Sequence, residues 1–104
     1  MKQGEVWWAH LPPPVGTRPV LLLSRDEAIA VRESVTVAPA TTRRRGLKTE
    51  VFVSAQEGMP KDCVVNLDSL GTIEKTTLSQ RVCLLSPDKM EQVHQAIRFA
   101  LDLP

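Results

Sequence analysis

The sequence predicts a small, mostly β-stranded domain that ends in one α-helix, an α+β arrangement. Two patterns lead to this prediction. Short runs of strand-favouring residues alternate with proline and glycine turns up to Leu85, and the remaining residues change to helical spacing. The chain of 104 residues leaves room for one modest hydrophobic core. We therefore expect residues 1–104 to form a single domain, in which mainly antiparallel strands make a barrel-like sheet.

The first two strands are predicted on either side of a proline-rich loop. Residues 4–10 are rich in strand-favouring types and end before three consecutive prolines, Pro12–Pro14, which cannot continue a hydrogen-bonded ladder. The sequence Gly-Thr-Arg-Pro at 16–19 then leads into Val-Leu-Leu-Leu at 20–23. Unbroken apolar character suits a strand covered on both faces, so we place residues 20–23 near the centre of the sheet.

The next two strands are predicted to form a hairpin. Valines alternate with serine and threonine in residues 34–38, and this run ends at Pro39-Ala40, which leaves Thr41 and Thr42 at a strand end. The loop that follows is Arg43-Arg44-Arg45-Gly46. Residues 49–53 are predicted to return beside the previous strand as the second arm of the hairpin.

Three further segments supply the remaining strands. Residues 63–68 alternate again, which places Asn66 and Asp68 on one face and the side chains between and before them on the other. Residues 72–73 and 81–85 complete the sheet.

The C-terminal segment is predicted to be an amphipathic helix. Ser86, Pro87 and Asp88 form a helix start: a capping hydroxyl, a proline at the first helical position and an acid in the first turn. Apolar residues then recur at helical spacing, and we expect this stripe to pack on the sheet; its members are Met90, Val93, Ala96, Ile97, Ala100 and Leu101.

Positive charge is local in this sequence, because the formal net charge is only +1. Arg43, Arg44 and Arg45 are adjacent in a predicted loop, where guanidinium groups could bind phosphates; a solvated loop is the alternative. Arg18 directly precedes the most buried predicted strand. It either emerges at the edge of the sheet or is held by an acid such as Asp68.

Two tryptophans and two histidines are also candidates for function. Trp7 and Trp8 point to opposite faces of the first strand, so at most one belongs to the core, and the other could cover a dimer surface or stack on a base. His10 could be a general base by type, but such a residue is more often a hydrogen-bonded sheet histidine. His94 flanks the apolar stripe of the helix and is interpreted as a boundary residue.

Several function classes lack their signatures. Cys63 and Cys83 are far apart and have no Cys or His at ligand spacing, so we interpret them as reduced core thiols and expect no metal site. A glycine-rich phosphate loop and a Gly-x-Ser-x-Gly elbow are missing, which favours a mechanism without a cofactor. With no signal-like or membrane-spanning apolar run, we expect a cytoplasmic protein that does not bind membranes.

Taken together, several short motifs resemble the MazF/PemK/Kid toxin family over almost the whole chain. They are Gly4-Glu5-Val6-Trp7, then Gly16-Thr17-Arg18-Pro19-Val20-Leu21, then Val37-Ala38-Pro39-Ala40-Thr41-Thr42, followed by Asp68 and Thr72-Ile73. The resemblance implies a homodimer with a small Src-homology-3-like barrel, the fold of the MazF and CcdB toxins. It further implies an endoribonuclease that cleaves single-stranded RNA at a preferred sequence and is neutralised by a cognate antitoxin. In such toxins the 2′-hydroxyl attacks the adjacent phosphate without metal, which leaves a 2′,3′-cyclic phosphate or 3′-phosphate and a 5′-hydroxyl.

The same resemblance implies roles for individual residues. Arg18 matches the catalytic arginine, Thr41 the catalytic threonine, and Asp68 an acid with a base or orienting role. The expected RNA path is lined by Thr42, Arg43, Arg44 and Asn66, the last of which stands where some relatives have an arginine. The loop before Gly16 is shorter than in many relatives.

Two other functions remain open on the same fold. A DNA gyrase poison would depend mainly on residues of the C-terminal helix and not on Arg18 and Thr41. A catalytically weakened member would bind RNA or antitoxin and yield no cleaved ends.

Overall fold

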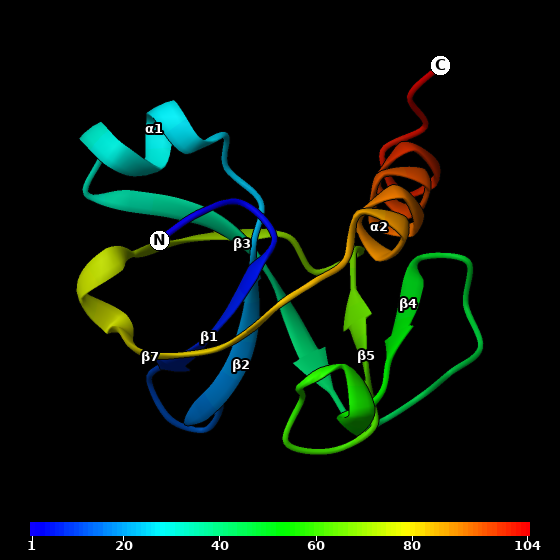
Figure 1. Cartoon of the computed structure of the whole chain (residues 1–104), viewed down its shortest axis with the longest axis horizontal. Helices are drawn as coiled ribbons and strands as arrows, with labels where there is room; N and C mark the ends of the chain where they lie inside the picture. Colours follow the sequence, from blue (N-terminus) through cyan, green and yellow to red (C-terminus); the bar gives the residue numbers. More distant parts are fainter.

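The computed structural model describes all residues from 1 to 104. Its strands surround two hydrophobic cores. One helix lies at each end of the molecule (Figure 1). The elements in chain order are β1 (Glu5–His10), β2 (Thr17–Leu22), α1 (Asp26–Val31), β3 (Ser34–Thr41), β4 (Glu50–Val53), β5 (Cys63–Asn66), β6 (Gly71–Glu74), β7 (Leu78–Leu84) and α2 (Pro87–Ala100). Two short 3-10 turns, η1 (Ala55–Glu57) and η2 (Lys75–Thr77), precede β5 and β7.

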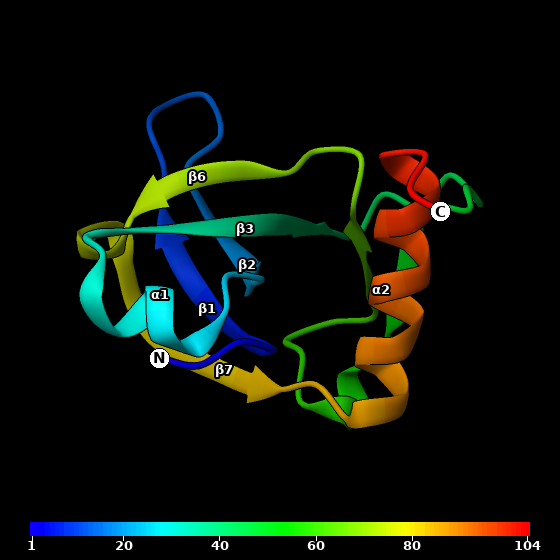
Figure 2. The same cartoon turned by 90° about the horizontal axis from the view of Figure 1, so that it is seen from above.

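All strand pairs are antiparallel, and they form an open sheet instead of the barrel that we expected. The strands are ordered β4-β5-β3-β2-β1-β7, and β6 pairs with β3 beside β5. The terminal strands of this path, β4 and β7, do not pair with each other. Instead, α2 follows β7 and packs against β4, so a helix covers the gap that a closing ladder would fill. Figure 2 shows β3 and β6 running side by side between the two helices.

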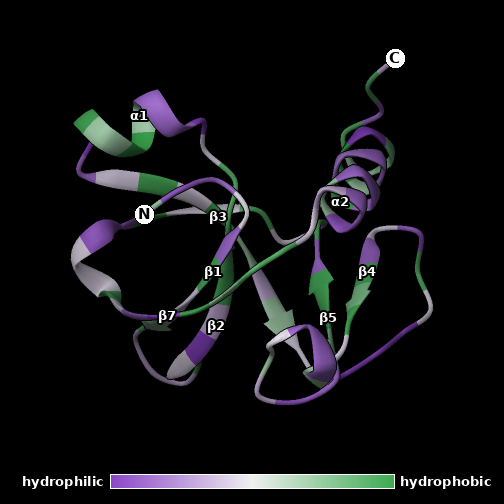
Figure 3. Ribbon diagram, viewed as in Figure 1, coloured by the Kyte–Doolittle hydropathy of each residue, from purple (hydrophilic) through white to green (hydrophobic).

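Strand β2 is central and buried on both faces, as its unbroken apolar run predicts. Leu21 belongs to the larger core, beneath α2, whereas Val20 and Leu22 point into a second core that contains Ile29 of α1. The apolar residues of β2 and β5 appear as continuous hydrophobic segments in Figure 3. Side chains that alternate between two cores fix the register of β2 against both neighbours.

The predicted hairpin between residues 34–38 and 49–53 is wrong. Strand β4 pairs with β5, and β5 in turn pairs with the end of β3 through Ala40 and Thr41. The arginine-containing loop therefore connects two strands, β3 and β4, that are separated in the sheet by β5. The β4–β5 register brings buried Val51 opposite buried Val65, so this pairing places both side chains in the larger core.

The helices show one confirmed prediction and one element that we did not predict. The start of α2 is confirmed, because the Ser86 hydroxyl accepts a hydrogen bond from the Lys89 amide at 3.1 Å and Pro87 opens the helix. At its end, Leu101 is 54% exposed and does not join the buried stripe. Helix α1 has only six residues, too few to show a helical period.

Neither helix is long and apolar enough to cross a lipid bilayer.

Candidate functional site

A polar groove of about 270 Å³ lies where the start of β2, the end of β3 and the loop after β3 meet. We call it the arginine groove. Its lining residues carry three positive charges and one negative charge, and none is apolar apart from a proline; they are Arg18, Pro39, Thr41, Arg43, Arg45, Glu50, Asn66 and Ser69.

Arg18 reaches the groove because of strand alternation. It is the second residue of β2, and its side chain points away from the face that carries Pro19. Its Nε donates a long hydrogen bond of 3.5 Å to the carbonyl of Val15, and its guanidinium makes no ion pair with any carboxylate. Of the two possibilities for Arg18, the structure shows the first: it emerges at the end of the sheet and is not held by Asp68.

Thr41 is the last residue of β3 and fixes the start of the loop. Its Oγ1 accepts a hydrogen bond of 3.2 Å from the backbone N–H of Arg43. Since the oxygen is the acceptor in this contact, the hydroxyl hydrogen of Thr41 is free to donate to another group in the groove. The backbone turn also directs Arg43 into the groove.

Glu50 anchors the rest of the arginine loop. Its carboxylate accepts hydrogen bonds from the backbone N–H of Arg45, at 2.9 and 3.3 Å, and of Leu47, at 3.3 Å. The bond from Arg45 is the main reason that the pKa of Glu50 lies below its ordinary value. Gly46 between them has a φ of 70°, a conformation that glycine adopts without strain.

This arrangement leaves the groove with positive charge that is not neutralised. Glu50 uses its oxygens on the loop backbone, and none of Arg18, Arg43 and Arg45 makes an ion pair. The sequence analysis did not consider Glu50. It considered Arg45 only as a member of the arginine run that could bind phosphates, and the expected RNA path did not include it. The available signal for Glu50 was its position four residues after Gly46, the glycine that ends the arginine run. A carboxylate at this distance can accept hydrogen bonds from the backbone of the loop.

Asn66 lies in the groove, and Asp68 does not. The Oδ1 of Asn66 accepts from the backbone N–H of Asp68 at 2.9 Å, and its Nδ2 donates to Ser69 Oγ at 3.2 Å. The carboxylate of Asp68 accepts from the hydroxyl of buried Thr49 at 2.6 Å and lines a neighbouring hollow beside Phe99. Within one chain, Asp68 is therefore separated from Arg18 and Thr41, although its turn positions Asn66.

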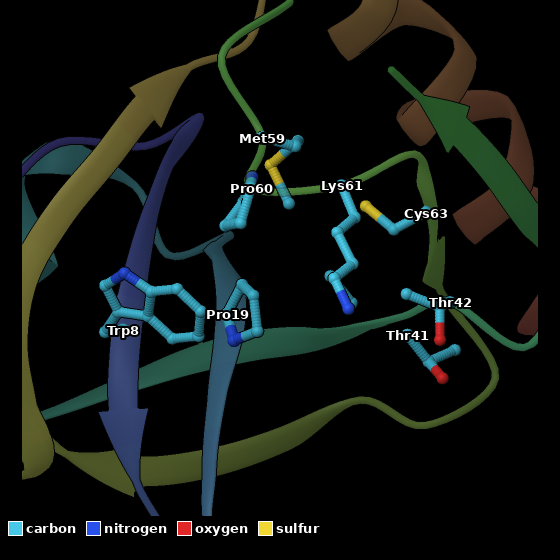
Figure 4. Close-up of a pocket in the computed structure, with 9 residues that line it drawn as sticks. Trp8, Pro19, Thr41, Thr42, Met59, Pro60, Lys61 and Cys63 are labelled. Carbon is cyan, nitrogen blue, oxygen red and sulfur yellow. The ribbon is translucent and has the colours of Figure 1, made fainter. Parts of the chain in front are cut away.

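The two other predicted RNA-binding residues also lie outside the arginine groove. The guanidinium of Arg44 stacks over the ring of Phe52, 4.5 Å from its centroid. Thr42 lines a second cavity, which we call the apolar pocket and which shares Thr41 with the groove (Figure 4). The apolar pocket is lined by Trp8, Pro19, Ala40, Thr41, Thr42, Met59, Pro60, Lys61 and Cys63.

Both cysteines are free and buried, as predicted. Burial raises the pKa of the Cys63 thiol to about 11 and also raises the pKa of Cys83, so both stay protonated at neutral pH. Neither thiol is therefore suited to act as a nucleophile. His10 is confirmed as a hydrogen-bonded sheet histidine, with its Nδ1 3.0 Å from Thr17 Oγ1.

The chemistry of the groove is that of an anion site. Guanidinium groups hydrogen-bond phosphate oxygens in pairs, and a hydroxyl that can donate adds a further contact. The fold and the groove thus define a small β-sheet domain with a positively charged groove at the end of its central strands.

Comparison with known proteins gives the family. The family model described as "PemK-like, MazF-like toxin of type II toxin-antitoxin system" matches residues 2–101. The chain belongs to this family. A Mycobacterium tuberculosis relative named "Probable endoribonuclease MazF2" is 39% identical over 99 residues, which cover 94% of this chain and 95% of the relative.

Solved structures of the same kind share the fold. The structure of the Mycobacterium tuberculosis toxin MazF-mt6 superposes with a TM-score of 0.89 at 36% identity, and covers 96% of this chain and 98% of that one. A mycobacterial endoribonuclease in complex with its cognate antitoxin superposes with a TM-score of 0.90 at 25% identity, over 100% of this chain and 97% of that one. The open antiparallel sheet with a C-terminal helix is therefore the arrangement found in MazF toxins.

Proposed function

We propose that this chain is an endoribonuclease toxin that cleaves single-stranded RNA at a short preferred sequence, without metal, in its arginine groove. The observation that carries the proposal is the presence of three arginines without ion pairs and a free hydroxyl donor in one groove of a PemK-like, MazF-like chain. Relatives named endoribonuclease support the same activity.

The proposed reaction is attack of a 2′-hydroxyl on the adjacent phosphate. Negative charge builds up on the phosphate oxygens in the transition state, and preorganised donors aimed at those oxygens lower the barrier. Arg18 provides the guanidinium and Thr41 the hydroxyl donor. The products are a 2′,3′-cyclic phosphate, or the 3′-phosphate formed from it, and a 5′-hydroxyl.

The remaining groove residues bind the RNA on either side of the reacting phosphate. Arg43 and Arg45 contact neighbouring phosphates, and Asn66 offers a polar side chain that is already oriented by its turn. For Asp68 the geometry within one chain favours the orienting role over the role of base, because its carboxylate is bonded to Thr49 and its backbone to Asn66. Thr42 and Arg44 flank this path.

The proposed macromolecular partners are a cognate antitoxin and a second copy of the chain. An acidic segment of an antitoxin would neutralise the groove, and one structural relative was solved with its antitoxin bound. Three large apolar side chains near the C-terminus, Phe99, Leu101 and Leu103, are each more than half exposed. Exposed apolar groups concentrated in one segment are typical of an interface.

The test is incubation of the purified protein with a long single-stranded RNA in excess EDTA, followed by mapping of every new 5′ end. We expect discrete cuts that bear 5′-hydroxyls and that disappear with Arg18→Ala. Intact RNA with both proteins contradicts the proposal and shifts the assignment to a gyrase poison or a binding-only protein. Loss of cutting in EDTA that returns with added metal contradicts the metal-independent part.

A further inference from the structure

The apolar pocket next to the arginine groove has no role in the phosphate chemistry proposed above. Its cavity measures about 150 Å³, and one wall is made by Trp8 and Pro19, which face each other in register across β1 and β2. Met59 and Pro60, in the loop before β5, form the opposite wall (Figure 4). Two facing apolar walls that include an indole ring suit a flat ring as occupant.

One cationic side chain enters this otherwise apolar space. Lys61 extends across the pocket, and its amine lies between Pro19 and Thr42 (Figure 4). The amine makes no ion pair or hydrogen bond within the chain. By contrast, the amines of Lys75 and Lys89 each donate to a backbone carbonyl. Lys61 is therefore a donor available to an occupant of the pocket.

The pocket lies next to the groove, because the two cavities share one lining residue and take neighbouring residues of β2. Thr41 lines both cavities, and the adjacent residues Arg18 and Pro19 point into the groove and the pocket respectively. A nucleotide whose phosphate lies at Arg18 and Thr41 thus has its base or that of its neighbour beside the pocket.

The donor character of Lys61 distinguishes among the bases. A lysine amine only donates hydrogen bonds. Guanine and uracil present a keto oxygen on the edge where adenine and cytosine carry an amino group, which is itself a donor. The Lys61 amine can therefore donate a hydrogen bond to the keto oxygen of guanine or uracil. It cannot bond to the amino group of adenine or cytosine, because both groups are donors.

We propose that the apolar pocket binds the base next to the scissile phosphate and that Lys61 makes the pocket selective for guanine or uracil. Trp8 supplies the stacking surface, and Lys61 hydrogen-bonds the keto oxygen. This inference rests on the proposed ribonuclease function, since it concerns the selectivity of the same site.

The test compares cut sites in a pool of RNAs with randomised sequence for the native protein, for Lys61→Met and for Lys2→Met. Lys2 is the matched control, because it is an exposed lysine whose side chain lines neither the pocket nor the groove. We expect guanine or uracil at one position next to the cut in the native protein and in Lys2→Met. In Lys61→Met this preference should fall by about fivefold to tenfold while cutting continues. An unchanged preference in Lys61→Met overturns the proposal.

A second readout does not require cleavage, so it separates failure of this inference from failure of the ribonuclease function. In a Trp7→Phe background the fluorescence reports Trp8, and the ligands are 2′-O-methyl oligonucleotides, which lack the attacking hydroxyl. We expect quenching by oligonucleotides with guanine or uracil, weak quenching by abasic counterparts, and loss of the difference in Lys61→Met. Equal quenching by the abasic ligand, or quenching only by an antitoxin peptide, overturns the proposal even if the native protein cuts RNA.

Discussion

At the scale of single residues, the site depends on which polar groups are engaged within the chain and which are free. Glu50 and Asp68, the two carboxylates around the arginine loop, are bonded to the loop backbone and to Thr49. The guanidinium groups of Arg18, Arg43 and Arg45 make no ion pair. The result is a fixed loop with free cations, which can attract a polyanion without first breaking an internal contact.

The role of the Thr41 hydroxyl can be tested with two substitutions of similar size. Thr41→Val removes the hydroxyl and Thr41→Ser keeps it. We expect the valine variant to cleave RNA roughly a hundredfold more slowly, because one transition-state donor is lost, and the serine variant to stay within about tenfold of the native rate. The measurement is the single-turnover rate constant. Equal rates for valine and serine would show that Thr41 acts only through its place at the end of β3.

The role of Glu50 can be tested by pH. Its pKa is lowered in the folded chain from an ordinary value of 4.5. Its stabilisation of the loop is therefore complete above that value and is lost as the pH falls through the lowered pKa. We expect Glu50→Ala to lower the protection of the Arg45 and Leu47 amide hydrogens at neutral pH, measured against the intrinsic exchange rate at the same pH, whereas the native protein should lose this protection only in acid. Glu27→Ala, in α1, is the control, and unchanged exchange in Glu50→Ala would rule out the anchoring role.

At the scale of elements, strand β2 connects the core to the site. Its apolar residues Leu21 and Leu22 are fully buried, and its first residues carry Arg18 into the groove. The sequence was sufficient to predict this strand, the end of β3 at Thr41 and the capped start of α2, because each is encoded by local pattern. The partner of β4 was not predictable in this way, because pairing with β5 depends on contacts beyond neighbouring segments.

The importance of β2 predicts a measurable loss of stability. Leu21→Ala leaves a cavity in the larger core, and we expect the free energy of unfolding to fall by about 2–5 kcal/mol. Leu84→Ala is the matched control, since Leu84 is 55% exposed and should change stability little. Chemical denaturation of both variants gives the comparison. A loss below that of Leu84→Ala would contradict the placement of β2 at the centre.

At the scale of the whole molecule, the sheet remains open because α2 covers the gap between β7 and β4. Hydrophobic patterning predicted the segments that form strands, but it could not distinguish closure of the sheet by a ladder from coverage of the gap by a helix. The site showed the same limit. The sequence and the family resemblance selected Arg18, Thr41, Arg43 and Asn66, all of which line the groove. They could not show that Arg44 stacks on Phe52 while Arg45 faces the groove.

The proposed homodimer predicts the mass in solution. Light scattering should give about twice the chain mass of 11.5 kDa at micromolar concentration. A mass of one chain at every concentration would contradict the dimer, while leaving the groove chemistry of the single chain to be judged by cleavage.

The central claim is that the arginine groove cleaves RNA by attack of a 2′-hydroxyl. Its most direct test is single-turnover cleavage, in EDTA, of an oligonucleotide with the mapped sequence and of a counterpart with one 2′-deoxy nucleotide at the cut. Native protein should cut only the all-ribose strand, and Arg18→Lys should cut it at least about tenfold more slowly, because lysine cannot bind phosphate in a fixed fork. Arg32→Lys, an exposed arginine outside the groove, should match the native rate. Cleavage of the deoxy-substituted strand, or equal rates for the native protein and Arg18→Lys, would contradict the account.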